Sequence, residues 1–264
     1  MSIFKDLKRM YFLIGGLGGV MIALSLSMLN VGSLFVNCAI ATFWILAINY
    51  YLNRIAGQRL IKLRSLVSDC KCREYIDAVQ ELRSGTKKKE KWLEFDLSSG
   101  YLALGDYEKA LKILKAVPLR NDGTRIDILE QLFINSNLIS IYTELNQIPS
   151  AENALRNVEQ LLDYPVLRDS HKAMYGSILL QRRIVLDIAK GNYEGNKETL
   201  INLLSRERTT LGKVAFHYRL GLIYIFEKQY GKAEECLSFV IENGGDTRFV
   251  SMAKEQLSGF PSCP

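Results

Sequence analysis

Charged side chains are absent from a long stretch near the N-terminus, since no Asp, Glu, Lys, Arg or His lies between Arg9 and Arg54. Cysteine is scarce, with 5 residues in 264, which excludes a disulfide-built scaffold. Proline is scarce too, also with 5 residues, which excludes collagen-like and proline-rich chains. The overall composition, 23% charged and 10% aromatic, excludes a disordered chain. The sequence therefore divides into an uncharged N-terminal block and a remainder of ordinary globular composition.

The uncharged block, residues 10–53, is long enough for two membrane-spanning helices, because one span needs about 20 apolar residues. The polar turn at residues 30–33 divides it. We therefore expect a transmembrane helical hairpin with spans Tyr11–Leu29 and Leu34–Leu52. A cleaved signal peptide is the alternative. It fits less well, because a second apolar segment follows directly and no A-x-A-like cleavage site precedes it.

Basic residues flank both ends of this expected hairpin, whereas its turn carries no charge. They are Lys5, Lys8 and Arg9 before it, and Arg54, Arg59, Lys62 and Arg64 after it. Positive flanks stay on the cytoplasmic side, so we expect both termini in the cytoplasm. A bacterial inner membrane is our expectation from compactness alone, and an intracellular eukaryotic membrane stays open.

Small residues recur every four positions in the first span, at Gly15, Gly19, Ala23 and Ser27. Such a stripe lets helix backbones approach closely in lipid. Packing against the second span of the same chain is the simpler interpretation, because that partner is always nearby. Homodimerisation is the alternative.

The remainder of the chain shows helical periodicity and repeated units. Two segments share one pattern of small and large residues: Leu97-Ser98-x-x-Tyr101 with Tyr107-x-x-Ala110-x-x-x-Leu114, and Leu220-Gly221-x-x-Tyr224 with Tyr230-x-x-Ala233-x-x-x-Leu237. Both resemble the tetratricopeptide (TPR) repeat, a helix–turn–helix unit. Weaker units follow Tyr142 and Gly191; in the latter, Asn196 replaces the usual Ala.

The resemblance implies an all-α fold, in which the transmembrane hairpin is followed by a TPR-like α-solenoid of about four to five helix pairs. The expected parts are a basic cytoplasmic N-terminus (1–10), the two-span hairpin (11–52), a basic juxtamembrane helix with a first half repeat (53–92), the repeats with a C-terminal capping helix (93–258), and a tail (259–264). The juxtamembrane helix is expected at Gln58–Cys70 and the capping helix at Asp246–Leu257.

Excess positive charge is concentrated after the hairpin, where residues 54–92 hold 11 basic and 5 acidic side chains. Four lysines stand close together there: Lys87, Lys88, Lys89 and Lys91. They suit either attraction to anionic lipid head groups or a solvated loop that follows the positive-inside bias. Nucleic-acid binding is not expected, because aromatics are not interleaved and the repeats carry no basic stripe.

No catalytic or metal-binding motif is present. His171 and His217 lack a second ligand at helical spacing, and Cys70-x-Cys72 is a single pair, whereas a zinc site needs about four ligands. Phosphate-loop and nucleophile-elbow motifs are missing. We therefore expect no cofactor, no metal and no enzymatic activity.

The TPR resemblance implies a concave groove lined by the first helix of each pair. Alignment of the repeat markers places Asn137, Arg182 and Arg219 at the same position of successive units, with Ser140, Gln181 and Tyr218 beside them. These six are called the groove residues below. Some members of the family hold a peptide's terminal carboxylate at such positions, but Phe95, Ser99 and Ile178 stand where further clamp residues are expected. The alternative is that the groove residues are simply solvated.

Two functions follow. The first is a membrane-anchored, non-enzymatic adaptor or scaffold whose groove binds a protein or peptide, best an acidic or C-terminal one, because Arg pairs bidentately with carboxylates. The second is an accessory subunit of a membrane complex, docking through the hairpin. The sequence does not identify the partner.

Overall fold

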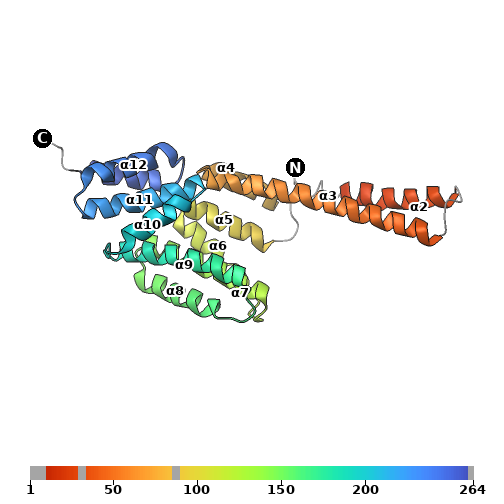
Figure 1. Ribbon diagram of the computed structural model, residues 1–264, viewed down its shortest axis with the longest axis horizontal. Helices are drawn as coiled ribbons and strands as arrows, with labels where there is room; N and C mark the ends of the chain where they lie inside the picture. Colours follow the sequence, from red (N-terminus) through yellow and green to blue (C-terminus); the bar gives the residue numbers. More distant parts are fainter. Residues whose placement is uncertain (1–9, 29–33, 85–89, 261–264) are drawn as a thin grey trace. The chain divides into compact units, whose positions relative to one another are not determined.

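The computed structural model describes residues 10–28, 34–84 and 90–260, and within them all regular secondary structure is helical (Figure 1). This confirms the expected all-α class. The elements, in chain order, are η1 (Tyr11–Leu17, π-helical), α2 (Gly18–Met28), α3 (Leu34–Ser68), α4 (Cys72–Ser84), α5 (Lys91–Leu104), α6 (Tyr107–Lys115), α7 (Arg125–Glu144), α8 (Ile148–Leu162), α9 (Asp169–Ala189), α10 (Asn196–Arg206), α11 (Thr210–Phe226), α12 (Tyr230–Asn243) and α13 (Arg248–Ser258).

The chain forms two compact units. Unit 1 comprises Met1–Ser65 and Asp77–Glu90, and unit 2 comprises Leu66–Ile76 and Lys91–Pro264. Unit 1 contains η1, α2 and most of α3, whereas the repeats lie in unit 2. The two units are described separately.

In unit 1, the small residues of the first apolar segment pack against α3. A methyl group added at Gly19 would lie 3.1 Å from Ile45, and one added at Gly15 would lie 3.4 Å from Ile48. The later glycine thus lies beside the earlier isoleucine of α3. This order of contacts shows that the two helices are antiparallel. Ala23 is half-buried and Ser27 is exposed. The structure thus shows packing within the chain at Gly15 and Gly19, as the simpler interpretation expects.

Only one helix among the described residues is long and apolar enough to cross a membrane, the α3 segment Phe35–Ser68; the apolar helix Leu13–Met28 is shorter. The expected end of the first span, Leu29, and the turn at 30–33 lie outside the described residues. The two-span hairpin therefore stays a prediction.

Helix α3 continues without a break from its apolar half into its basic half, which carries Arg54, Arg59, Lys62 and Arg64. The juxtamembrane helix expected at Gln58–Cys70 is thus the end of α3, and it stops at Ser68. Cys70, at φ 62°, is in the left-handed region that ends helices.

Unit 2 is built from helix pairs. Helices α5 and α6, α7 and α8, and α11 and α12 pack as successive neighbours, while α9 packs on α7 and α8. The small residues of the repeat pattern lie where the helices cross, since Ala110, Ala151 and Ala233 are all fully buried. Side-chain caps start three of the helices: Asp106 accepts from the Lys109 amide, Thr124 from the Asp127 amide, and Thr209 from the Gly212 amide.

Helix α10 departs from this pattern and packs on α11. It begins at Asn196, whereas α6 and α12 begin at their marker residues Tyr107 and Tyr230. Gly195, at φ 76°, precedes it, and the side-chain Nδ2 of Asn196 donates to the Asn192 carbonyl at 3.1 Å. The residue that replaces the repeat alanine thus starts the helix instead of filling a crossing point.

The last elements of unit 2 return to its first elements. Asp246 accepts hydrogen bonds from the amides of Cys72 at 2.5 Å and Arg73 at 2.8 Å, and its own amide donates to the Cys70 carbonyl at 3.1 Å. Asp246 therefore caps the N-terminus of α4. Helix α13 packs on α11 and α12 with Phe249 and Ala253 buried. It covers the last repeat, as expected of a capping helix. The residues just before it also connect the end of unit 2 to its beginning, at the start of α4.

Candidate functional site

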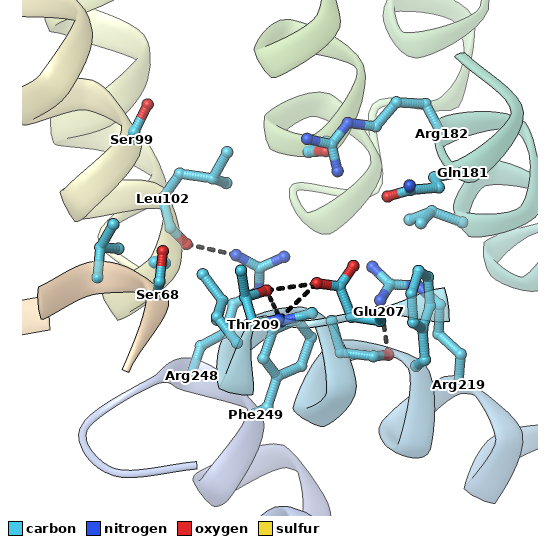
Figure 2. A pocket seen from close by; sticks show the side chains of 18 of the residues that line it. Ser68, Ser99, Leu102, Gln181, Arg182, Glu207, Thr209, Arg219, Arg248 and Phe249 are labelled. Atoms are coloured by element: carbon cyan, nitrogen blue, oxygen red, sulfur yellow. Dashed lines mark hydrogen bonds between the residues drawn. The ribbon is translucent and has the colours of Figure 1, made fainter. Parts of the chain in front are cut away.

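Unit 2 contains a pocket of about 360 Å³ between the inner helices of its repeats (Figure 2). Side chains from the end of α3 and from α5, α7, α9, α11 and α13 line it, together with the loop before α11. Its polar lining comprises Ser68, Ser99, Asn137, Ser140, Gln181, Arg182, Glu207, Thr209, Arg219 and Arg248.

The structure brings five of the six groove residues together around this pocket: Asn137, Ser140, Gln181, Arg182 and Arg219. Tyr218 is the exception. It is buried in the core between α11 and α13, with its ring centroid 5.6 Å from that of Phe249. The next residue, Arg219, lines the pocket instead, so Tyr218 and Arg219 do not share a face. The use of these residues in binding stays a prediction.

Arg219, on α11, is 8% exposed. Its Nη1 donates to the Ala215 carbonyl at 2.7 Å, and its guanidinium lies 5.6 Å from the centre of the Phe249 ring. No carboxylate within the described ranges forms an ion pair with it. Burial, and next the nearby charge of Arg248, lower the pKa of Arg219 to about 10.

Arg182 reaches the pocket from α9 (Figure 2). Its Nε is buried and has no hydrogen-bond partner among the described residues. Burial, and next the charge of Arg248, lower the pKa of Arg182 to about 10. Both arginines are still cations at neutral pH, and neither forms an ion pair among the described residues, although the nearby charge of Glu144 acts on both.

Arg248, at the start of α13, is a pocket residue that the sequence analysis missed. It donates to the Leu102 carbonyl and, at 3.0 Å, to Glu144 Oε1, and both side chains of this ion pair are nearly buried. The residue lies outside the repeat pattern. A weak signal was present, because a cation in the first turn of a helix opposes the helix dipole.

Glu207 also lines the pocket and was missed, because it lies in the loop between α10 and α11. Its Oε1 accepts from the amides of Arg208 and Thr209 and from the Thr209 hydroxyl, at 2.9, 2.8 and 2.7 Å. Thr209 Oγ1 in turn accepts from the Gly212 amide and caps α11. One oxygen of this carboxylate is therefore satisfied by its own loop.

The neutral polar residues of the pocket differ in whether their side chains already have hydrogen-bond partners within the protein. Ser99 Oγ donates to the Phe95 carbonyl and Asn137 Nδ2 to the Phe133 carbonyl, both at 3.0 Å. Ser140 Oγ is buried without a hydrogen-bond partner among the described residues. Buried polar groups are nearly always bonded, so the Ser140 hydroxyl is available to an occupant of the pocket.

Groups of His, Cys, Asp and Glu that could hold a metal ion are not found in the described ranges. The ring of His217 stacks on Phe239, with centroids 4.1 Å apart, and burial lowers its pKa. Burial also raises the pKa of Cys70 to about 11 and that of Cys72 to about 12. Both thiols are therefore protonated at neutral pH and are weak nucleophiles.

The lysine cluster is only partly described, since Lys87, Lys88 and Lys89 lie outside the described residues. Lys91 begins α5, and its Nζ lies 2.6 Å from Glu130 Oε2. It thus takes part in an ion pair within unit 2, and a role of this lysine cluster at a membrane surface stays a prediction.

Residues 214–242 match the Tetratricopeptide repeat family. The match covers most of α11 and α12, one of the two pairs whose sequences follow the repeat pattern closely. No curated protein matches the chain, and no solved structure matches it. The matched repeat and the all-helical architecture support a TPR-like helical-repeat protein, a class that acts in protein–protein interaction.

Proposed function

We propose that the protein is a membrane-anchored, non-enzymatic adaptor that binds a protein or peptide through the pocket of its TPR-like unit. The observation that carries this proposal is the pocket lining, where two largely uncompensated arginines, Arg182 and Arg219, meet an unpartnered hydroxyl. Buried cations without carboxylate partners are costly. An anionic group on a partner would offset that cost.

The exposed apolar surface of unit 1 supports membrane anchoring. Phe35, Phe43 and Tyr50 on α3 are 83%, 74% and 71% exposed, and only 11% of the most apolar part of this helix is buried. The core helix of a soluble protein would be mostly buried, so a lipid environment suits α3 better. We propose two spans with both termini cytoplasmic. A C-terminal tag digested only from the outer face of sealed vesicles would refute this topology.

Partner capture tests the binding role. We would purify the tagged full-length chain from solubilised membranes and compare it with the double variant Arg182→Glu, Arg219→Glu. The expected result is loss of the captured protein, because both charges reverse inside the pocket. The control is Arg183→Glu, Arg206→Glu, since both residues are exposed and outside the pocket. Capture at wild-type yield by the double variant would refute the role of the pocket.

The accessory-subunit alternative depends on the outer apolar faces of unit 1, because Gly15 and Gly19 are already covered by α3. Replacing residues 10–53 by an unrelated hairpin separates the two functions. An adaptor keeps its partner after the exchange, whereas an accessory subunit loses it.

A further inference from the structure

The closure of unit 2 limits what its pocket can hold. An open repeat array offers a long concave surface, but here Asp246 joins α13 to the start of α4, and Arg248 joins α13 to Leu102 on α5 and Glu144 on α7. The volume of the pocket, about 360 Å³, lies at the lower end of the range for small-ligand sites, roughly 300–1,000 Å³. The pocket thus suits one compact group better than an extended peptide.

The electrostatics of the pocket favour an anion. Arg182, Arg219 and Arg248 come from three different helices and point towards the same space (Figure 2). Of these three arginines, only Arg248 forms an ion pair within the described ranges, with Glu144. Glu207 is the second carboxylate nearby, and its own loop satisfies one of its oxygens. Two guanidinium groups therefore keep donors without a charged partner.

The arrangement of these donors distinguishes between anions. A carboxylate has two oxygens in one plane, and a single guanidinium satisfies it bidentately. Here the arginine donors come from α9, α11 and α13, where the Nε of Arg248 also has no partner among the described residues, and the Ser140 hydroxyl comes from α7. Donors from several directions match a tetrahedral group, and a phosphoryl group brings about two negative charges and three acceptor oxygens.

We propose that this pocket binds a phosphoryl group, held by Arg182 and Arg219 with the Ser140 hydroxyl, while the ion-paired Arg248 adds positive charge. The assignment rests on the pocket being the binding site of the proposed function, and it narrows the partner chemistry to a phosphoryl group. That group belongs either to a small molecule or to a phosphorylated side chain, and the two sources share the same contacts.

Inorganic phosphate added to the purified full-length chain in a non-ionic detergent is the direct test. Thermal stability is measured as phosphate replaces chloride at constant ionic strength, because a ligand that binds only the folded state raises the melting temperature. We expect a saturable rise with phosphate and none with acetate. Arg182→Met and Arg219→Met should each weaken phosphate binding about tenfold or more, the loss expected for charge-assisted hydrogen bonds.

Two further variants keep the test informative if an arginine variant folds poorly. Glu207→Gln removes a negative charge from the pocket lining and should tighten phosphate binding. Arg183→Met removes the adjacent, exposed arginine of α9 and should leave binding unchanged. The proposal is overturned if neither the wild type nor Glu207→Gln gives a saturable rise, if acetate acts as strongly as phosphate, or if Arg183→Met loses as much affinity as Arg182→Met.

The source of the group is read from a second titration, with a phosphoserine peptide and its unphosphorylated form. Tighter binding of the phosphopeptide than of inorganic phosphate supports a modified protein partner, and the reverse order supports a small molecule. Partner capture by the same variants separates this inference from the adaptor role. Phosphate binding with unchanged capture by Arg182→Met refutes the pocket's role in the adaptor alone, and lost capture without phosphate binding refutes the phosphoryl assignment alone.

Discussion

The two units place apolar side chains in opposite ways. In unit 1, Phe43 is 74% exposed, whereas in unit 2 Phe216 is 4% exposed. Charge follows the reverse pattern, because α2 and the first half of α3 carry none, while unit 2 nearly buries Arg219 and Arg248. Both units are helical, so secondary structure does not separate them. The membrane anchoring that we propose for unit 1 accounts for the contrast, since lipid accepts exposed apolar side chains and water does not.

Within unit 2, the largest difference is expected between replacing the ion-paired Arg248 and replacing the unpaired Arg182, measured as the change in unfolding free energy. Arg248→Met leaves Glu144 and the Leu102 carbonyl without their partner, and removal of one member of a buried pair costs about 3–5 kcal/mol of unfolding free energy. Arg182→Met removes a desolvated charge without leaving an ion-pair partner behind, so it should be neutral or stabilising. Denaturant unfolding of the two full-length variants measures the contrast. Equal losses would show that the unpaired arginine is structural.

A carboxylate placed on the apolar surface of each unit tests whether unit 1 lies in lipid and unit 2 in water. Leu46 in unit 1 is 60% exposed and Leu180 in unit 2 is 43% exposed. Leu46→Asp should impair membrane insertion by about 3 kcal/mol, the cost of Asp near the centre of a spanning helix. Leu180→Asp should leave insertion unchanged. Membrane fractionation after carbonate extraction measures both, and full insertion of Leu46→Asp would argue against a spanning α3.

Crossing points of the repeats should be intolerant of added volume. Ala233 is fully buried on α12, and its replacement by Leu should cost about 1–3 kcal/mol by overpacking. Ala173 on α9 is exposed, so Ala173→Leu is the matched control with little effect. Urea denaturation gives both values. A neutral Ala233→Leu would mean that α11 and α12 do not cross closely.

The smallest effect is expected at the closure of unit 2. Asp246→Ala removes the acceptor of two amides at the start of α4, and loss of an N-cap costs about 0.5–2 kcal/mol. Asp163 is exposed at the end of α8, and Asp163→Ala should be neutral or slightly stabilising, because an anion opposes the dipole there. Hydrogen exchange at the first turn of α4 reads the local effect. Unchanged exchange there would place the closure elsewhere.

The groove residues show how far local sequence patterns reach. The repeat markers identified Asn137, Arg182 and Arg219 as equivalent positions, and all three do line one pocket. The same alignment added Tyr218, which belongs to the core, because neighbours in sequence were taken to share a face. Arg248 and Glu207 were missed because each lies outside the repeating units, where no period applies.

The sequence by itself determined the features that depend on neighbouring residues: the uncharged block, the helical periodicity, and the repeat that matches at residues 214–242. The tertiary structure alone decided that Asp246 returns to Cys72 and Arg73, that Arg248 takes Glu144, and that Arg182 and Arg219 are left without a carboxylate partner among the described residues. Periodicity is set by the helix repeat within a few residues. Pairing across more than a hundred positions depends on how the helices stack, which no local pattern encodes.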